Sequence, residues 1–72
     1  MLSIDEREAE TIYILAKIGV IDRNEFIYMA SHLQRRSYIG SQYLYWLCLR
    51  SHGDTQPHVL GEIDFTKLKC IF

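Results

Sequence analysis

Between residues 4 and 18, apolar and polar side chains alternate with the period of an α-helix. Ser3 and Glu6 have the spacing of a capping box, in which the two residues hydrogen-bond reciprocally at the start of a helix. Gly19 is a residue type that commonly follows a last helical turn. One face of this helix collects the apolar side chains of Ala9, Ile12, Tyr13 and Ala16. The pattern therefore predicts a helix over residues 4–18 with one buried face.

A second helix is predicted over residues 22–36. Asp22 and Glu25 repeat the capping-box spacing, and Ile21 with Phe26 occupies the two positions of a hydrophobic staple. Two independent local signals thus indicate the same start. The apolar stripe at helical spacing consists of Phe26, Met29, Ala30 and Leu33. We expect this stripe to face the core.

The third predicted helix covers residues 38–52 and is apolar on most of its sides. Either Ser37 or Ser41 is a suitable cap, and Gly53 is a suitable stop. One side of the helical wheel holds Tyr43, Leu44 and Leu47, and another holds Tyr38, Tyr45, Trp46 and Leu49. Because two neighbouring helices cannot cover all of these sides, we expect a partner protein or a second copy of the chain to cover the rest.

The helical pattern stops after Gly53, and residues 54–72 are predicted as a short C-terminal tail. Residues 58–65 partly alternate apolar with polar side chains, which is typical of a strand. Alternatively, Asp64 caps a brief terminal helix that carries Leu68, Ile71 and Phe72. Both signals are weak, so we expect the tail to dock only loosely on the helices.

The length of 72 residues predicts a single domain, residues 1–72, and the helical patterns make it a small all-α domain of two or three helices. A chain this short buries a smaller fraction of its surface than a larger domain does. Some apolar surface is therefore expected to remain uncovered, and we expect the protein to self-associate.

The net charge of −1 argues against direct nucleic-acid binding, which draws most of its affinity from Lys and Arg on phosphates. Acidic residues between 5 and 10 interrupt the region where a signal peptide would need an apolar segment. The longest apolar run, residues 12–21, is about half the length of a membrane span. These features together favour a cytoplasmic protein with no membrane partner.

No catalytic constellation is present, and we expect neither enzymatic activity nor a cofactor. Cys48, His52, His58 and Cys70 are the residue types of a zinc site, but their spacing matches no familiar zinc module. We therefore expect no bound metal. In a reducing cytosol the two cysteines are expected to remain thiols, with Cys48 as a core residue.

Trp and Tyr are enriched at protein-binding hot spots, which directs attention to the second and third helices. The candidate contact residues for a partner are Leu33, Tyr38, Tyr45, Trp46 and Leu49. For Trp46, a core position and an interface position are equally open. The candidates for electrostatic steering of an acidic partner are Arg35, Arg36 and Arg50, with Lys67 and Lys69 nearby. Alternatively, these residues form an ordinary solvated face with no binding role.

Ala30 followed by Leu33, a basic pair at 35–36, Tyr38 and then Trp46 resembles the AraC negative regulators, a family of small enterobacterial virulence regulators. The resemblance implies a negative regulator of transcription that binds an AraC-type activator directly and blocks its dimerisation or DNA binding. PerC-like regulators, which act positively and touch DNA weakly, are the second possibility. A generic protein-interaction module unrelated to transcription is the third, since the pattern also suits a single tetratricopeptide-type helix pair.

Overall fold

The protein is a small all-α protein, as the sequence predicts. The computed structural model describes residues 1–50 and 61–68. Their helices are α1 (Ile4–Lys17), α2 (Arg23–Arg36), α3 (Tyr38–Arg50) and the short 3₁₀ helix η1 (Phe65–Lys67). The helix bounds agree with the predicted ones to within one residue, except that residues 51 and 52 of the third predicted helix lie outside the described residues.

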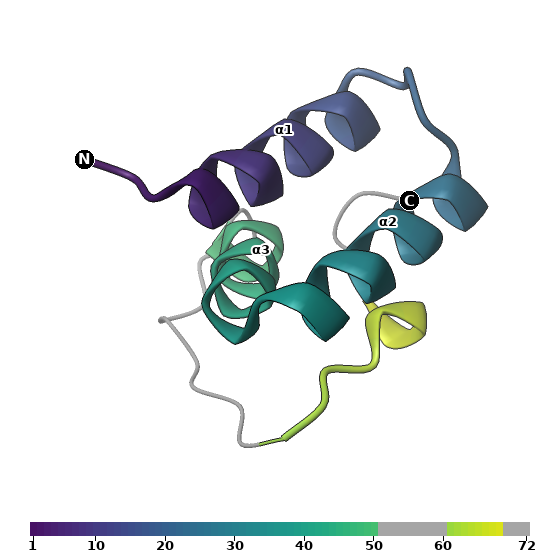
Figure 1. Cartoon of the computed structure of the whole chain (residues 1–72). Helices are drawn as coiled ribbons and strands as arrows, with labels where there is room; N and C mark the ends of the chain where they lie inside the picture. The colour runs from purple at the N-terminus through teal and green to yellow at the C-terminus, as the bar shows by residue number, and fades with distance from the viewer. Residues whose placement is uncertain (51–60, 69–72) are drawn as a thin grey trace.

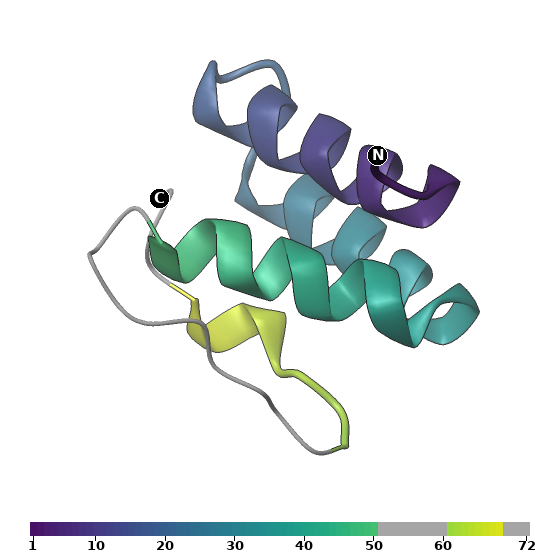
Figure 2. The same ribbon diagram turned by 90° about the vertical axis from the view of Figure 1, so that its left-hand side faces the viewer.

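The three α-helices pack against one another around a common core. In Figure 1, α1 and α2 lie across the view and α3, seen nearly end-on, crosses both. Figure 2 shows α3 in front, with α1 above it and η1 below it. The side of α3 that faces the viewer in Figure 2 is therefore flanked by α1 and by η1.

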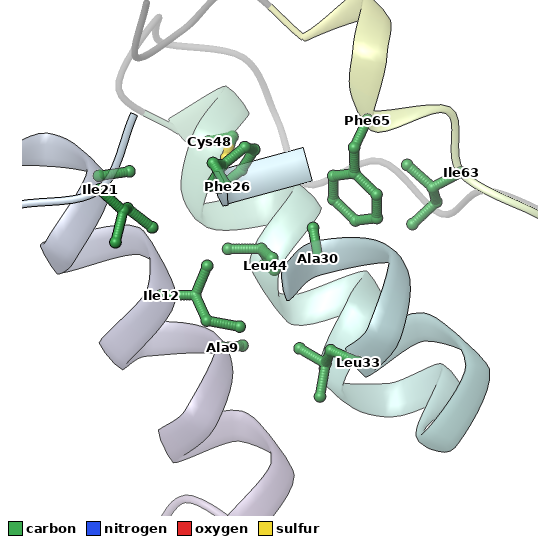
Figure 3. Packing of buried hydrophobic residues seen from close by; sticks show 11 residues of the cluster. Ala9, Ile12, Ile21, Phe26, Ala30, Leu33, Leu44, Cys48, Ile63 and Phe65 are labelled. Atoms are coloured by element: carbon green, nitrogen blue, oxygen red, sulfur yellow. The ribbon is translucent and has the colours of Figure 1, made fainter. Parts of the chain in front are cut away.

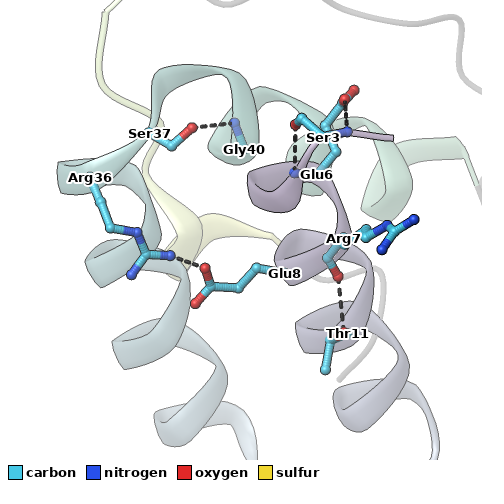
Figure 4. A network of polar contacts seen from close by, with 8 residues as sticks. All are labelled: Ser3, Glu6, Arg7, Glu8, Thr11, Arg36, Ser37 and Gly40. Carbon is cyan, nitrogen blue, oxygen red and sulfur yellow. Dashed lines mark hydrogen bonds and ion pairs between the residues drawn. The ribbon is translucent and has the colours of Figure 1, made fainter. Parts of the chain in front are cut away.

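Both predicted capping boxes are confirmed. The Ser3 backbone N–H donates to Glu6 Oε1 at 3.0 Å and the Glu6 N–H donates to Ser3 Oγ at 3.2 Å (Figure 4). At α2, the Asp22 N–H donates to Glu25 Oε1 at 3.1 Å, and the Glu25 N–H donates to Asp22 Oδ1 at 2.8 Å. Each box satisfies two backbone N–H groups that a helix start otherwise leaves to water.

The end of α1 is a Schellman motif built on Gly19. The Gly19 N–H donates to the Ala16 carbonyl at 3.2 Å, and the Val20 N–H donates to the Leu15 carbonyl at 2.9 Å. This geometry requires a left-handed backbone, and Gly19 has φ of 82°. The turn leads directly into the buried Ile21 and the cap of α2.

A single residue, Ser37, joins α2 to α3. Its N–H donates to the Leu33 carbonyl at 2.7 Å, which ends α2, and its Oγ accepts the Gly40 N–H at 3.0 Å, which begins α3 (Figure 4). Of the two predicted caps, Ser37 is thus the one used. Ser41 is instead buried, and its hydroxyl donates to the Tyr38 carbonyl at 2.9 Å.

The core combines large aliphatic and aromatic side chains with small residues at the helix contacts (Figure 3). Small residues let helix backbones approach closely, and Gly40 is the clearest case. A Cβ at this position would lie 3.0 Å from Leu33 Cδ1 and 3.2 Å from the Asp5 carbonyl oxygen. The buried apolar set is Ala9, Ile12, Ala16, Ile21, Phe26, Ala30, Leu33, Leu44, Leu47, Cys48, Ile63 and Phe65.

We expect Gly40→Val to lower the free energy of unfolding by about 2 kcal/mol or more, because overpacking a closed contact forces the backbone apart. Equilibrium urea unfolding followed by circular dichroism measures this change. Ile39→Val is the matched control, since Ile39 is the neighbouring residue and is 63% exposed. Equal stabilities of the two variants would contradict the close contact between α1 and α3.

The expectation of a loosely docked tail is wrong for residues 61–68. Ile63 and Phe65 are 5% and 3% exposed and belong to the core. Phe65 meets Phe26 edge-to-face, with ring centroids 6.2 Å apart and an interplanar angle of 82°. The Gln34 side-chain amide donates to the Ile63 carbonyl at 3.0 Å, and its oxygen accepts the Ile63 N–H at 2.6 Å. The Arg23 guanidinium also donates to a backbone carbonyl of this segment, that of Thr66.

Asp64 caps η1, which agrees with the alternative prediction of a brief helix at this point. Hydrogen bonds from the Thr66 hydroxyl and N–H lower the pKa of the Asp64 carboxyl below its ordinary value of 3.8. A lowered pKa in the folded state stabilises the cap fully above pH 3.8, and this stabilisation disappears as the pH falls through the lower value. We expect an NMR titration of the carboxyl to give a midpoint below 3.8 that returns to 3.8 in urea. A folded-state midpoint at or above 3.8 would contradict the cap.

Candidate interaction surface on the third helix

Helix α3 has one face in the core and one face directed away from it. Successive residues are rotated by about 100°, so the buried positions fall together on one side of the helix. These buried residues are Gly40, Ser41, Leu44, Leu47 and Cys48. The opposite side, called here the outward face, consists of Tyr38, Ile39, Gln42, Tyr45, Trp46 and Leu49.

Four of the five residues expected to contact a partner lie on this outward face. Tyr38 is 47% exposed, while Tyr45, Trp46 and Leu49 are half-buried. The fifth, Leu33, is 1% exposed, so the expectation that it contacts a partner is wrong. It belongs to the core stripe of α2 and packs where α1, α2 and α3 meet (Figure 3).

The Trp46 indole is held by two neighbours from its own helix. Its ring lies 5.7 Å from that of Tyr43, at an angle of 50°, and the Arg50 guanidinium lies 4.8 Å from the ring centroid. Both partners are one helical turn away, which is the spacing at which side chains on a helix meet. A side chain fixed in this way loses less conformational entropy when a partner covers it.

Tyr43 connects this cluster to α1, a contact that the sequence analysis missed. Its hydroxyl donates to Glu10 Oε2 at 3.4 Å. Burial, followed by the negative charge of Glu10 and this hydrogen bond, raises the pKa of Tyr43 above 10.0. The hydroxyl therefore remains a donor at neutral pH. The acidic cluster on α1 was the available signal, but the sequence does not indicate which carboxylate faces α3.

On its other side the outward face continues onto the C-terminal segment. An open pocket lies beside Tyr45, and its other lining residues are Glu62, Ile63, Asp64, Lys67 and Leu68. Aromatic and aliphatic side chains thus stand next to charged groups, which is the arrangement of an interface with an apolar centre and a polar rim. Apart from Lys67, these residues were not predicted to lie at the site, because the tail was expected to dock only loosely.

The three arginines expected to steer a partner do not form one patch. Arg36 pairs with Glu8 of α1 (Figure 4), and Arg35 is exposed at the same end of α2. Arg50 is the last residue of α3. It lies about 18 Å along the helix axis from the first residue of α3, which is close to Arg36 in the chain. Only Arg50 adjoins the outward face, where it covers Trp46. The structure therefore does not bring the three arginines together, and a role in steering a partner stays a prediction for each of them.

Of the four residues considered for a zinc site, only Cys48 lies within residues 1–50 and 61–68. Cys48 is buried, as expected, whereas His52, His58 and Cys70 lie outside the described residues. No three His, Cys, Asp or Glu side chains within the described part of the chain are grouped so that they could hold a metal ion. Among the same residues, no helix has the length and apolar character needed to cross a membrane.

No family model, curated protein or solved structure matches this chain. We therefore infer its function from the geometry of the outward face and from the residues that form it.

Proposed function

We propose that the chain is a protein-binding module that inhibits an AraC-type transcriptional activator by binding it directly through the outward face of α3. The observation that carries this proposal is the common placement of Tyr38, Tyr45, Trp46 and Leu49 on the side of α3 opposite its fully buried residues, where Tyr45 also packs partly against the core. The class of partner comes from the resemblance of residues 30–46 to the AraC negative regulators.

The composition of the face supports binding to a protein. Trp, Tyr and Arg dominate binding hot spots, because they offer large contact areas with a polar tip. Here Trp46 lies between Tyr43 and Arg50, so all three types stand together. The pocket beside Tyr45 offers a place for an apolar side chain of the partner, and Glu62, Asp64 and Lys67 at its rim offer charged groups of both signs for polar contacts.

Inhibition follows from occupancy of the activator. When this module covers the surface with which the activator dimerises or binds DNA, the activator can no longer use that surface. The free energy of the new contact sets how far the equilibrium shifts from the DNA-bound activator to the activator bound by the module. The module itself needs no DNA contact, which agrees with its net charge of −1.

The proposal is tested by titrating the full chain into an AraC-type activator already bound to fluorescently labelled promoter DNA. We expect the anisotropy to fall as the activator leaves the DNA, and a control without activator to show no DNA binding. Unchanged anisotropy across several activators would refute the proposal. Direct binding of the chain to DNA, weakened steeply by salt, would favour a PerC-like regulator instead.

Tyr28→Ala is the matched control variant. Tyr28 is 68% exposed on α2 and stacks on His32, so it is an aromatic surface residue away from the outward face of α3. We expect this variant to release the DNA as well as the unmodified chain does. If Tyr28→Ala and a variant of the outward face lost the ability to release the DNA equally, the contact with the activator would lie elsewhere.

A further inference from the structure

A second surface, on α1, presents apolar side chains that no part of the described chain covers. Ile4, Ile14 and Ile18 are 82%, 47% and 66% exposed, and they project from the side of α1 that faces away from the core. Their spacing of ten and four residues keeps them within one stripe of the helix. Val20, which follows the Schellman turn, extends the exposed apolar surface at 62%.

The polar residues in the stripe are compatible with burial against another helix. Thr11 donates its hydroxyl to the Arg7 carbonyl at 2.9 Å, so its hydrogen bond is made within the helix (Figure 4). Arg7 has a long aliphatic stem that can cover apolar surface while the guanidinium stays in water. We call the set Ile4, Arg7, Thr11, Ile14 and Ile18 the α1 stripe.

Two charges beside the α1 stripe make it complementary to itself. Glu10 lies four residues before Ile14 and Lys17 lies three residues after it, both on the same side of the stripe. A two-fold axis through Ile14 that sets two copies of α1 antiparallel brings each Glu10 opposite the other copy's Lys17, to within about 1.5 Å along the helix. The same axis places each Arg7 near the C-terminal end of the facing helix, where a cation is favourable.

We infer that the α1 stripe is a dimer interface, on which a second copy of this chain docks antiparallel with Ile14 at the two-fold axis. A symmetric interface of this kind uses the same patch on both copies. A standard interface buries about 800 Å² per partner, a large share of the 4802 Å² surface of this chain. One helix face offers less, so the dimer forms reversibly and depends on concentration.

The dimer is separate from the surface on α3 and does not depend on the proposed function. The α1 stripe and the outward face of α3 share no residue, although Glu10 beside the stripe accepts a hydrogen bond from Tyr43, which packs on Trp46. The self-association is therefore tested on the chain alone, without any activator. Failure of one proposal does not imply failure of the other.

Sedimentation equilibrium of the full chain over a range of concentrations tests the inference. We expect the average mass to rise with concentration from 8.5 kDa toward twice that value. Ile14→Asp is expected to weaken the dimer by at least about tenfold, because it places two carboxylates at the axis. Tyr28→Asp is the control outside the stripe, and we expect it to dimerise normally.

Charge reversal tests the antiparallel arrangement itself. Glu10→Lys and Lys17→Glu are each expected to weaken the dimer about three- to tenfold, since each creates two like-charge contacts across the axis. Combining them restores opposite charges and is expected to restore the dimer. Circular dichroism verifies that every variant stays folded. A chain that remains monomeric up to millimolar concentration, a dimer insensitive to Ile14→Asp, or a double variant without rescue would each overturn the inference.

Discussion

Phe65→Ala is expected to lower the free energy of unfolding by about 3–5 kcal/mol, the cost of truncating a buried phenylalanine. The Phe65 side chain is 3% exposed and packs edge-to-face on Phe26 of α2. Removing the ring leaves a cavity between α2 and the C-terminal segment and weakens the packing of Ile63 in the core. Urea unfolding followed by circular dichroism and by tryptophan fluorescence measures the loss.

The control for this variant is Lys67→Ala, two residues further along η1, where the side chain is exposed. We expect its unfolding free energy to stay within about 0.5 kcal/mol of the unmodified chain. Phe65→Leu keeps most of the volume and covers the case in which the alanine variant does not fold. A cost near zero for both Phe65 variants would mean that the segment is docked only loosely and would contradict its place in the core.

The sequence was most informative where interactions are local. The two capping boxes, the staple at Ile21 and Phe26, and the glycine that ends α1 each join residues within a few positions, so their spacing alone indicates the helix bounds. The two sides of α3 were also distinguishable, because the helical period separates Leu44 and Leu47 from Tyr45 and Trp46. Helix period and capping thus sufficed for the fold class and for most of the outward face.

What the sequence could not indicate depends on contacts between distant residues. Gln34 pairs with Ile63, 29 residues away, and no local pattern marks that pair. Leu33 carried both a core and a contact interpretation, and the absence of a side chain at Gly40 lets α3 close over it. Arg36 and Arg50 were both candidates for electrostatic steering, yet the length of α3 separates them. These features could not be predicted because they depend on how the helices pack, not on where the helices form.

Trp46→Ala is expected to weaken binding to the activator by about 2 kcal/mol or more, roughly 30-fold, while the helix content stays unchanged. The indole is half-buried between Tyr43 and Arg50 on the outward face, so its loss removes contact area for the partner but opens no closed cavity. The anisotropy titration gives the affinity, with Trp46→Phe expected to recover part of it. Global unfolding of Trp46→Ala would make Trp46 a core residue, and unchanged affinity in a folded variant would remove it from the contact. Either result would move the binding surface away from the centre of α3.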